Sequence, residues 1–177
     1  MADGDPAGVR GHDPGAVWAG SVRDGHVRLI PIRAYVAADF AGVAELWRAV
    51  FPDDPPYSRA EVAIPAKLAV QPQYLLIATD GERVVGTASG GYDGTRGWLY
   101  AVAVAASHRR QGLGARLVQA VEARLAAAGC GKINLQVRAG NADVTGFYES
   151  LGYCVEPRVS MGKRLGVNAG GTGTSGP

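Results

Sequence analysis

Hydrophobic and polar positions follow two different periods along this chain, and each period predicts one kind of element. Alternating or continuous apolar runs bounded by turn residues are typical of strands. Such runs cover residues 27–35, 74–79, 83–89, 98–104 and 132–138, and a less regular extended region covers 154–163. Asp80-Gly81 stands between the second and third runs, and Asp93-Gly94 stands before the fourth; both pairs predict hairpin turns.

Four other segments have apolar residues three or four apart, which is the period of an amphipathic helix. They are residues 39–51, 58–71, 112–128 and 141–151. Asp39 stands where it can cap the first helix, and Pro65 weakens the second. The third has the most regular stripe, and Gly129 ends it. The order of the segments, β-α-α-β-β-β-α-β-α-β, predicts an α+β domain with a mixed sheet.

The two ends of the chain differ in composition from the middle. Residues 1–26 are rich in Gly, Asp, Ala and Pro, and residues 166–177 are rich in Gly and Thr, so both are expected to be disordered. The folded domain is therefore predicted over residues 27–165. Cys130 and Cys154 lie in or beside apolar runs, which we interpret as buried thiols of a reduced, cytoplasmic protein.

Charge and hydropathy argue against two classes of partner. The 18 lysines and arginines against 16 acidic residues leave a formal net charge of +2, which is too small to predict nucleic-acid binding. No apolar run approaches the roughly 18 residues that a membrane span needs. With 47% hydrophobic residues in a chain of 177, a core can form without disulfide bonds.

A glycine-containing loop joins the fourth predicted strand to the third predicted helix. It reads Arg109-Arg110-Gln111-Gly112-Leu113-Gly114. Glycine lets main-chain N–H groups approach a ligand closely, and the first turn of a helix adds unpaired N–H groups and a partial positive charge. The loop therefore predicts a site for a phosphate or pyrophosphate. The alternative is an ordinary left-handed turn before a helix.

Two motifs together resemble those of the GNAT superfamily of acyl-CoA-dependent N-acetyltransferases. The glycine loop matches the family's Arg/Gln-x-x-Gly-x-Gly/Ala pattern. The segment from Asn141 to Tyr153 matches the second motif, in which Tyr148 follows the asparagine by seven residues. The resemblance covers residues 27–165 and extends to small bacterial members whose substrate is generally unassigned. It implies a three-layer α+β fold with a mixed, mostly antiparallel sheet of six to seven strands, about four flanking helices and splayed central strands.

The resemblance implies acetyl-CoA as cosubstrate and no metal. The loop and helix start would hold the pyrophosphate, and the Val102 N–H would polarise the thioester carbonyl. Arg109 and Arg110 equally fit a solvated basic loop, and Asn141 equally fits a helix N-cap. The implied cofactor-binding residues are Val102, Val104, Arg109, Arg110, Gln111, Gly112, Leu113, Gly114, Ala115 and Asn141.

Tyr148 is the catalytic residue that the resemblance implies. A phenol near the thioester sulfur would act as general acid and protonate the leaving thiolate. The alternative interpretation is a packed aromatic residue on an amphipathic helix, which is how we interpret Phe147 and Tyr153.

One departure from the family pattern concerns the acceptor. In the branch that acetylates protein N-termini, including those of ribosomal proteins, a glutamate at the position of Gln136 acts as base. Glutamine cannot accept the proton in that way. The identity of the base therefore stays open. Glu45, Asp53, Asp54 and Asp93 lie in segments that wall the acceptor site in this family, although each also fits a solvated surface charge. Tyr92 and Tyr100 are further candidates.

The sequence therefore predicts an N-acetyltransferase that passes an acetyl group from acetyl-CoA to a primary amine by direct attack in a ternary complex. Two alternatives stay open: an α-amine acetyltransferase acting on protein N-termini, and a CoA-binding regulatory module with little turnover. The expected acceptor is a small molecule or a protein N-terminus. Neither a nucleic acid nor a membrane is an expected partner, and the chain is predicted to be a monomer or a homodimer.

Overall fold

The computed structural model describes residues 22–23, 26–27 and 29–163, and its chain divides into two compact units, residues 1–137 and residues 138–177. Each unit is described by itself below. Most of the leader predicted for residues 1–26 and all of the tail predicted for 166–177 lie outside the described residues. Within the leader, β1 (Val22–Arg23) pairs antiparallel with β2 (His26–Val27).

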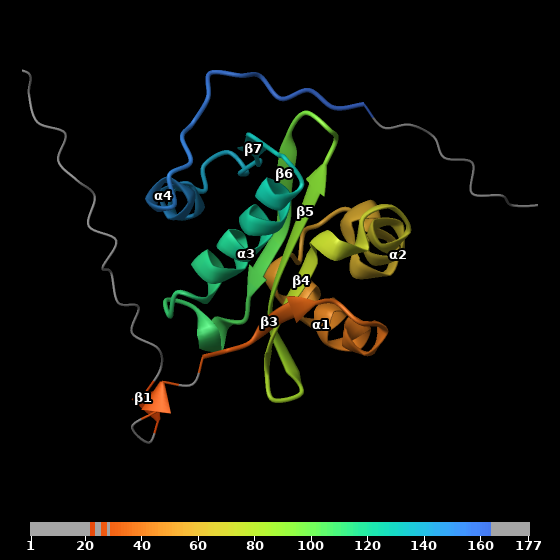
Figure 1. Ribbon diagram of the computed structural model, residues 1–177, viewed down its shortest axis with the longest axis vertical. Helices are drawn as coiled ribbons and strands as arrows, with labels where there is room; N and C mark the ends of the chain where they lie inside the picture. Colours follow the sequence, from red (N-terminus) through yellow and green to blue (C-terminus); the bar gives the residue numbers. More distant parts are fainter. Residues whose placement is uncertain (1–21, 24–25, 28, 164–177) are drawn as a thin grey trace, which may run out of the picture. The chain divides into compact units, whose positions relative to one another are not determined.

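The first unit is built on a five-stranded mixed sheet (Figure 1). Its strands, in spatial order, are β3 (Ile32–Ala34), β4 (Leu75–Asp80), β5 (Arg83–Tyr92), β6 (Gly97–Val104) and β7 (Ile133–Asn134). The first four run antiparallel to their neighbours, and β7 runs parallel to β6. Gly81 and Gly94 adopt positive φ in the two turns, at +61° and +88°, so both predicted hairpins are confirmed.

The predicted strand number was wrong, because the sheet has five strands and not six or seven. The run over 132–138 forms a strand only at Ile133–Asn134, and the extended region 154–163 forms none. That region bends at Pro157, whose ring removes an N–H donor from any ladder. Its large apolar side chains are exposed, at 74% for Val155 and 91% for Met161, so no buried face holds it in a sheet.

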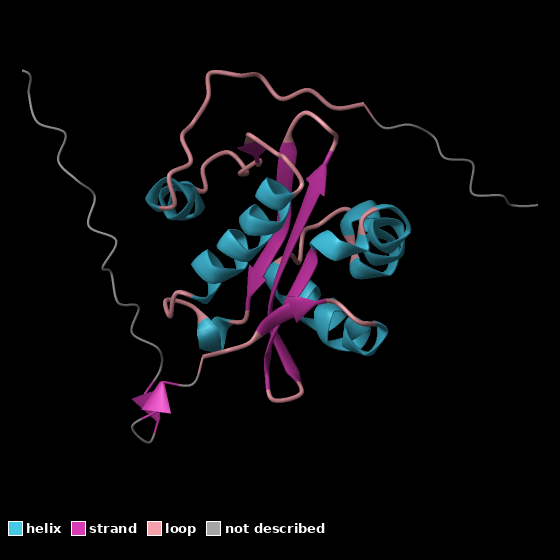
Figure 2. Ribbon diagram, viewed as in Figure 1, coloured by secondary structure: helices cyan, strands magenta, loops and turns pink. Residues whose placement is uncertain are grey.

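Helices cover the two faces of the sheet of the first unit (Figures 1 and 2). On one face lie α1 (Phe40–Val50) and α2 (Ala60–Val70), and on the other lies α3 (Leu113–Ala127). The stripe predicted for α3 is its buried face: Leu113, Leu117, Val121 and Leu125. A Cβ at Gly86 would lie 2.7 Å from Leu117, and one at Gly90 would lie 2.6 Å from Val121. These two glycines of β5 therefore allow α3 to pack closely against the sheet.

The second unit contains α4 (Ala142–Ser150). Asn141 occupies the N-cap position, and its Oδ1 accepts a hydrogen bond from the Val144 N–H at 3.3 Å. Gly152 follows the helix with φ of +91°, as the predicted stop requires. The element predicted over 141–151 is therefore confirmed to within one residue at each end.

The structure corrects the interpretation of the two cysteines. Cys154 is exposed and Cys130 is half-buried, so the prediction that both thiols are buried was wrong.

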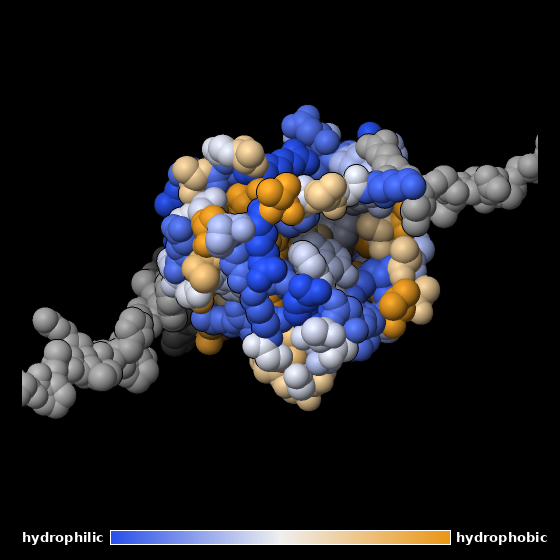
Figure 3. Space-filling model, turned by 90° about the horizontal axis from the view of Figure 1, so that it is seen from above, coloured by the Kyte–Doolittle hydropathy of each residue, from blue (hydrophilic) through white to orange (hydrophobic). Residues whose placement is uncertain are grey.

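On the face drawn in Figure 3, hydrophobic residues lie in separate groups among hydrophilic ones. Among the described residues, no helix has the length and apolar character that crossing a membrane requires.

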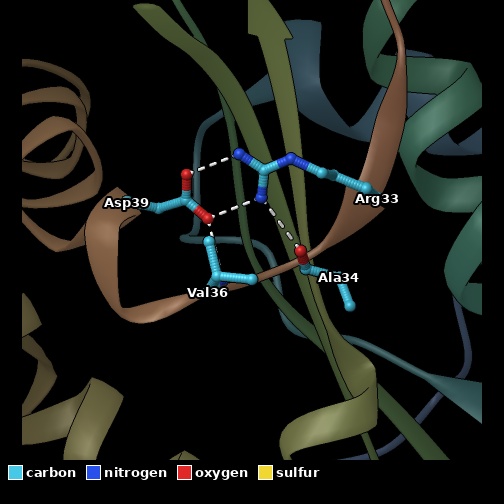
Figure 4. A network of polar contacts seen from close by, with 4 residues as sticks. All are labelled: Arg33, Ala34, Val36 and Asp39. Atoms are coloured by element: carbon cyan, nitrogen blue, oxygen red, sulfur yellow. Dashed lines mark hydrogen bonds and ion pairs between the residues drawn. The ribbon is translucent and has the colours of Figure 1, made fainter. Parts of the chain in front are cut away.

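Asp39 does not cap α1 through its side chain as predicted, because an ion pair occupies its carboxylate (Figure 4). Both carboxylate oxygens accept hydrogen bonds from Arg33, each at 2.7 Å, and Oδ2 also accepts one from the Val36 N–H at 2.8 Å. Asp39 is 6% exposed, whereas the Arg33 side chain is 44% exposed. The hydrogen bonds from Arg33 hold the pKa of Asp39 below its usual value and join β3 to the start of α1.

We expect Asp39→Asn to lower the free energy of unfolding at pH 7 by about 1–3 kcal/mol, since Arg33 and the Val36 N–H lose a charged partner. A lowered pKa in the folded state stabilises the protein above the unfolded-state pKa. That stabilisation is lost as the pH falls through the folded-state pKa. Urea unfolding should therefore show the same difference in unfolding free energy between the wild type and Asp39→Asn at pH 7 and pH 5. Near pH 3 this difference should be smaller.

Asp53→Asn is the matched control, because Asp53 is an exposed acid for which the described residues show no partner. It should change the unfolding free energy by less than about 0.5 kcal/mol at each pH. A difference for Asp39→Asn that stays constant down to pH 3 would contradict the assignment of the stabilisation to the charged pair.

Candidate active site

A bulge in β6 sets the geometry of the strand that leads to the glycine loop. Thr87 pairs with Ala103 and Ser89 pairs with Tyr100, so the single residue between them on β5 faces two residues, Ala101 and Val102, on β6. Ala101 has φ of +51°, in the left-handed region that side chains other than glycine seldom adopt. A strained residue of this kind persists only where its surroundings hold it.

Two buried side chains hold the bulge. The indole N–H of Trp47, on α1, donates to the Thr87 hydroxyl at 2.9 Å. That hydroxyl donates in turn to the carbonyl oxygen of Ala101, also at 2.9 Å. Trp47 is 7% exposed and Thr87 is fully buried, so water does not compete for these hydrogen bonds. Neither residue was predicted, because a threonine in a strand and a tryptophan on an amphipathic helix have no local signal for this role.

The bulge changes which residues of β6 face the α1 and α2 side. Tyr100 lines a pocket beside α2, and Ala101 and Ala103 pack against the core formed with α1 and α2. Strict alternation would place Tyr100 and Ala101 on opposite faces. One extra residue therefore rotates the end of the strand, including the predicted oxyanion donor Val102, relative to its beginning.

Pairing between β6 and β7 is limited to the first residues of β6. Gly97 pairs with Ile133 and Trp98 with Asn134, and the described residues show no further pair between these strands. The main chain from Leu99 to Val104 therefore has a strand neighbour on the β5 side only. An open edge of this kind supplies main-chain donors and acceptors to an extended ligand.

The glycine loop presents a run of unpaired N–H groups at the start of α3. Arg110 and Gly112 both adopt positive φ, at 59° and 74°, on either side of Gln111. Among the described residues, no hydrogen bond is formed by the N–H groups from Arg110 to Ala115, and the first one inside α3 is donated by Arg116. No side chain of the described residues caps the helix. A run of unpaired N–H groups at a helix N-terminus is the kind of arrangement that can bind an anion.

The side chains of the loop serve structure more than ligand contact. Arg109 Nε donates to the Val104 carbonyl oxygen at 3.1 Å, and Gln111 Nε2 donates to the Ser107 carbonyl oxygen at 3.0 Å. Leu113 and Ala115 are buried, at 3% and 7% exposure, so only their main chains are available to a ligand. Arg110 is exposed. The Arg109 bond joins the end of β6 to the loop, a contact that the motif did not predict.

Asn141 and Tyr148 belong to the second unit, and the structure places them within that unit. The interpretation of Asn141 as an N-cap is correct, since its side chain accepts a helix N–H. The Tyr148 ring lies edge-on to Phe147 and Tyr153, with centroid distances of 5.0 and 5.6 Å. Burial raises the pKa of Tyr148 to about 12, so the phenol keeps its proton throughout the physiological range.

The candidate bases differ in their surroundings. Asp93 Oδ1 accepts hydrogen bonds from the N–H groups of Thr95 and Arg96, which lower the pKa of Asp93 and make it a poor proton acceptor. The Tyr92 hydroxyl donates to carbonyl oxygens of Gly94 and Gly129. Both residues therefore serve the hairpin turn and its neighbourhood.

The other candidates for the base include two exposed acids. Glu45 and Asp53 are exposed, and Asp54 is half-buried. Gln136 is also exposed and lies beyond the end of β7, not within a strand as the family pattern implied. Tyr100 differs from all of these, because it lines a pocket.

The comparisons with known proteins agree with the two motifs. The model of the acetyltransferase (GNAT) family matches residues 40–153. An acetyltransferase of Yersinia enterocolitica is 37% identical over 139 residues, which cover 77% of this chain and 96% of the relative. The chain therefore belongs to the GNAT acetyltransferase family, whose cosubstrate is acetyl-CoA, and it is an N-acetyltransferase.

Solved structures with different acceptors share this fold. An aminoglycoside N-acetyltransferase in complex with CoA has a TM-score of 0.63 and 20% identity, over 77% of this chain and 95% of that one. A ribosomal-protein alanine N-acetyltransferase from Escherichia coli has a TM-score of 0.59 and 22% identity, over 70% and 77% of the two chains. At these identities the likeness concerns the fold and not the acceptor.

We expect Thr87→Val to lower the free energy of unfolding by about 2 kcal/mol, because it leaves the buried indole N–H of Trp47 without its acceptor. Turnover should also fall at a temperature where the variant remains folded, since the bulge loses its hydrogen bond to Ala101. Urea unfolding and steady-state kinetics measure the two effects.

Thr79→Val provides the control. Thr79 is similarly buried, at 8% exposure, and the described residues show no hydrogen bond from its hydroxyl. Its stability and turnover should stay close to those of the wild type. Equal losses in the two variants would show that the Thr87 hydroxyl has no special role at the bulge.

Proposed function

We propose that this protein transfers the acetyl group of acetyl-CoA to a primary amine by direct attack within a ternary complex. The observation that carries the proposal is the run of unpaired N–H groups from Arg110 to Ala115 at an uncapped helix start. A pyrophosphate offers several acceptor oxygens and two negative charges to such a site. Coenzyme A carries that group on an extended arm with amides, which the open edge of β6 suits.

The first unit supplies the donor site in this mechanism. The main chains of Gln111, Gly112, Leu113, Gly114 and Ala115 hold the pyrophosphate together with Arg110, whose exposed guanidinium adds positive charge. Arg109 acts through the Val104 carbonyl, which it fixes at the end of β6. Val104 and Val102 offer main-chain groups to the pantetheine arm, and the Val102 N–H polarises the thioester carbonyl. Asn141, at the start of α4 in the second unit, is a further donor-binding residue that the family resemblance implies.

Tyr148 acts on the leaving group. With its pKa raised to about 12, a full proton transfer to a thiolate of ordinary basicity, near 8.5, is uphill by roughly 5 kcal/mol. The phenol therefore stabilises the departing sulfur mainly as a hydrogen-bond donor that stays protonated. A hydrogen bond to a charged partner contributes about 1.5–3 kcal/mol, which sets the expected size of its effect.

The acceptor amine must be neutral to attack the carbonyl. An amine of pKa near 8 is about one-tenth neutral at pH 7, whereas a lysine amine near 10.4 is neutral in about one molecule in a few thousand. Asp93, with its lowered pKa, is a poor proton acceptor, and Gln136 cannot take a proton as a carboxylate does. A low pKa is therefore a favourable condition and not a requirement, because an amine of higher pKa still reacts through its smaller neutral fraction. Protein N-terminal α-amines meet this condition and form the second candidate acceptor class.

We expect Gly112→Ala to raise the KM for acetyl-CoA at least about tenfold, because a Cβ at φ of +74° strains the turn and intrudes on the N–H cradle. Gly129→Ala is the matched control at the other end of α3. It has φ of +85°, and a Cβ there meets nothing within 4 Å. Both variants should lose about 1–2 kcal/mol of stability, but only Gly112→Ala should weaken donor binding. An equal rise in the KM for acetyl-CoA in the two variants would contradict the proposal that the N–H groups beside Gly112 bind the donor.

We expect Tyr148→Phe to lower kcat about 10- to 100-fold with the KM for acetyl-CoA nearly unchanged, because only the hydrogen bond to the leaving sulfur is lost. Release of the CoA thiol in the presence of an accepted amine measures both parameters. Tyr153→Phe is the control from the same aromatic cluster. Unchanged turnover in Tyr148→Phe would remove the leaving-group role.

The ternary-complex proposal as a whole depends on an amine-dependent reaction. If acetyl-CoA binds but no amine in a broad panel raises thiol release above simple hydrolysis, the proposal fails. The chain would then fit the alternative of a CoA-binding module with little turnover.

A further inference from the structure

A small pocket lies beside the bulge, within the first unit. It has a volume of about 320 Å³ and is lined by Ala63, Ala66, Lys67, Val70, Gln71 and Tyr100. Its volume is at the lower end of the range for small-molecule sites. Tyr100 precedes Ala101 and Val102 directly, so the pocket adjoins the part of β6 where the thioester carbonyl is proposed to lie.

Lys67 is the only charged residue among those that line this pocket. Its ammonium group lies 5.4 Å from the centre of the Tyr74 ring and 5.6 Å from that of Tyr100, and it donates a hydrogen bond to the Gly90 carbonyl oxygen. Among the described residues, no carboxylate lies within ion-pair distance of Lys67. Lys67 is therefore half-buried, with its ammonium group over two aromatic faces. It has no counter-ion among the residues that the structure describes.

An ammonium group in such surroundings favours an anionic ligand. Aromatic faces and one carbonyl compensate only part of the cost of removing a cation from water. A carboxylate in the pocket would supply the missing opposite charge through a charge-assisted hydrogen bond. The remaining walls are mostly apolar, and their polar groups are engaged: Gln71 with the main chain of Tyr92, and the Tyr100 hydroxyl with the Gly90 carbonyl. Lys67 is thus the residue that sets the charge preference.

The pocket lies close along β6 to the proposed position of the thioester carbonyl. Tyr100 and Val102 are two residues apart, so their Cα atoms are at most about 7 Å from each other. A small acceptor, with only a few bonds between its amine and its carboxylate, suits two such neighbouring sites. We infer that the Lys67 pocket is an acceptor subsite that binds a carboxylate, and that the acceptor is a small primary amine of the amino-acid class. This inference rests on the acetyl transfer proposed above.

The test compares paired acceptors that differ only in the carboxylate. Small amino acids are assayed against their carboxamides with acetyl-CoA and the full chain, and kcat/KM is expressed per neutral amine. The wild type should prefer the carboxylate member about tenfold or more, mainly through KM. Lys67→Met should bring that preference close to one, and Lys67→Arg should keep most of it.

Two features of the chain make these variants suitable. The Gly90 carbonyl also accepts a hydrogen bond from the Tyr100 hydroxyl at 3.1 Å, so it keeps a partner when Lys67 is replaced. Methionine keeps a long apolar side chain at this position and removes the charge. Arg59→Met is the charge control, because Arg59 is an exposed cation at the start of the same helix. It should leave the preference unchanged, and thermal unfolding confirms that each variant is folded.

The outcomes separate the two proposals. If neither member of any pair nor any other amine is acetylated, the proposed function fails and the subsite fails with it. If amines are acetylated but the carboxylate brings no advantage, the proposed function stands and the subsite is overturned. The subsite is also overturned if Lys67→Met and Arg59→Met change the preference equally. A preference that Lys67→Met abolishes and Lys67→Arg retains supports the subsite.

Discussion

The hydroxyl of Thr87 is the point on which the geometry of β6 depends. It accepts from the indole of Trp47 on α1 and donates to the carbonyl of Ala101, so it joins a helix, a central strand and a bulge. That hydrogen bond helps to hold Ala101 at its positive φ, together with the packing of Ala101 against the core. The bulge in turn decides which side chains face α1 and α2 and how the strand approaches the glycine loop.

Two features of the first unit that are proposed to bind ligands consist of polar groups without a protein partner of opposite character among the described residues. The N–H groups at the start of α3 have no acceptors among the described residues, and Lys67 has no carboxylate there. By contrast, Asp39 has its full set of partners and joins β3 to α1. The Asp39 network stabilises the fold, whereas the unpartnered groups are the ones on which the proposed ligand sites depend.

Much of the architecture could be predicted from periodicity and turn residues. The α3 stripe, both hairpins, the stop at Gly129 and the helix that Asn141 caps were all predicted, since each depends on residues close together in the chain. The number of strands was not. Residues 132–138 have the composition of a strand, but a strand needs a neighbour, and the described pairing with β6 ends after two residues.

By itself, the sequence determined the family and the donor, because both motifs consist of residues whose spacing along the chain is enough to define them. The glycine loop needs only a strand before it and a helix after it. The roles of single residues that belong to no motif became visible only in the tertiary structure. Thr87, Trp47 and Lys67 have no motif, and each matters through a contact with a residue at least seven positions away. Such contacts form only when elements from different parts of the chain pack together, and local periodicity does not encode them.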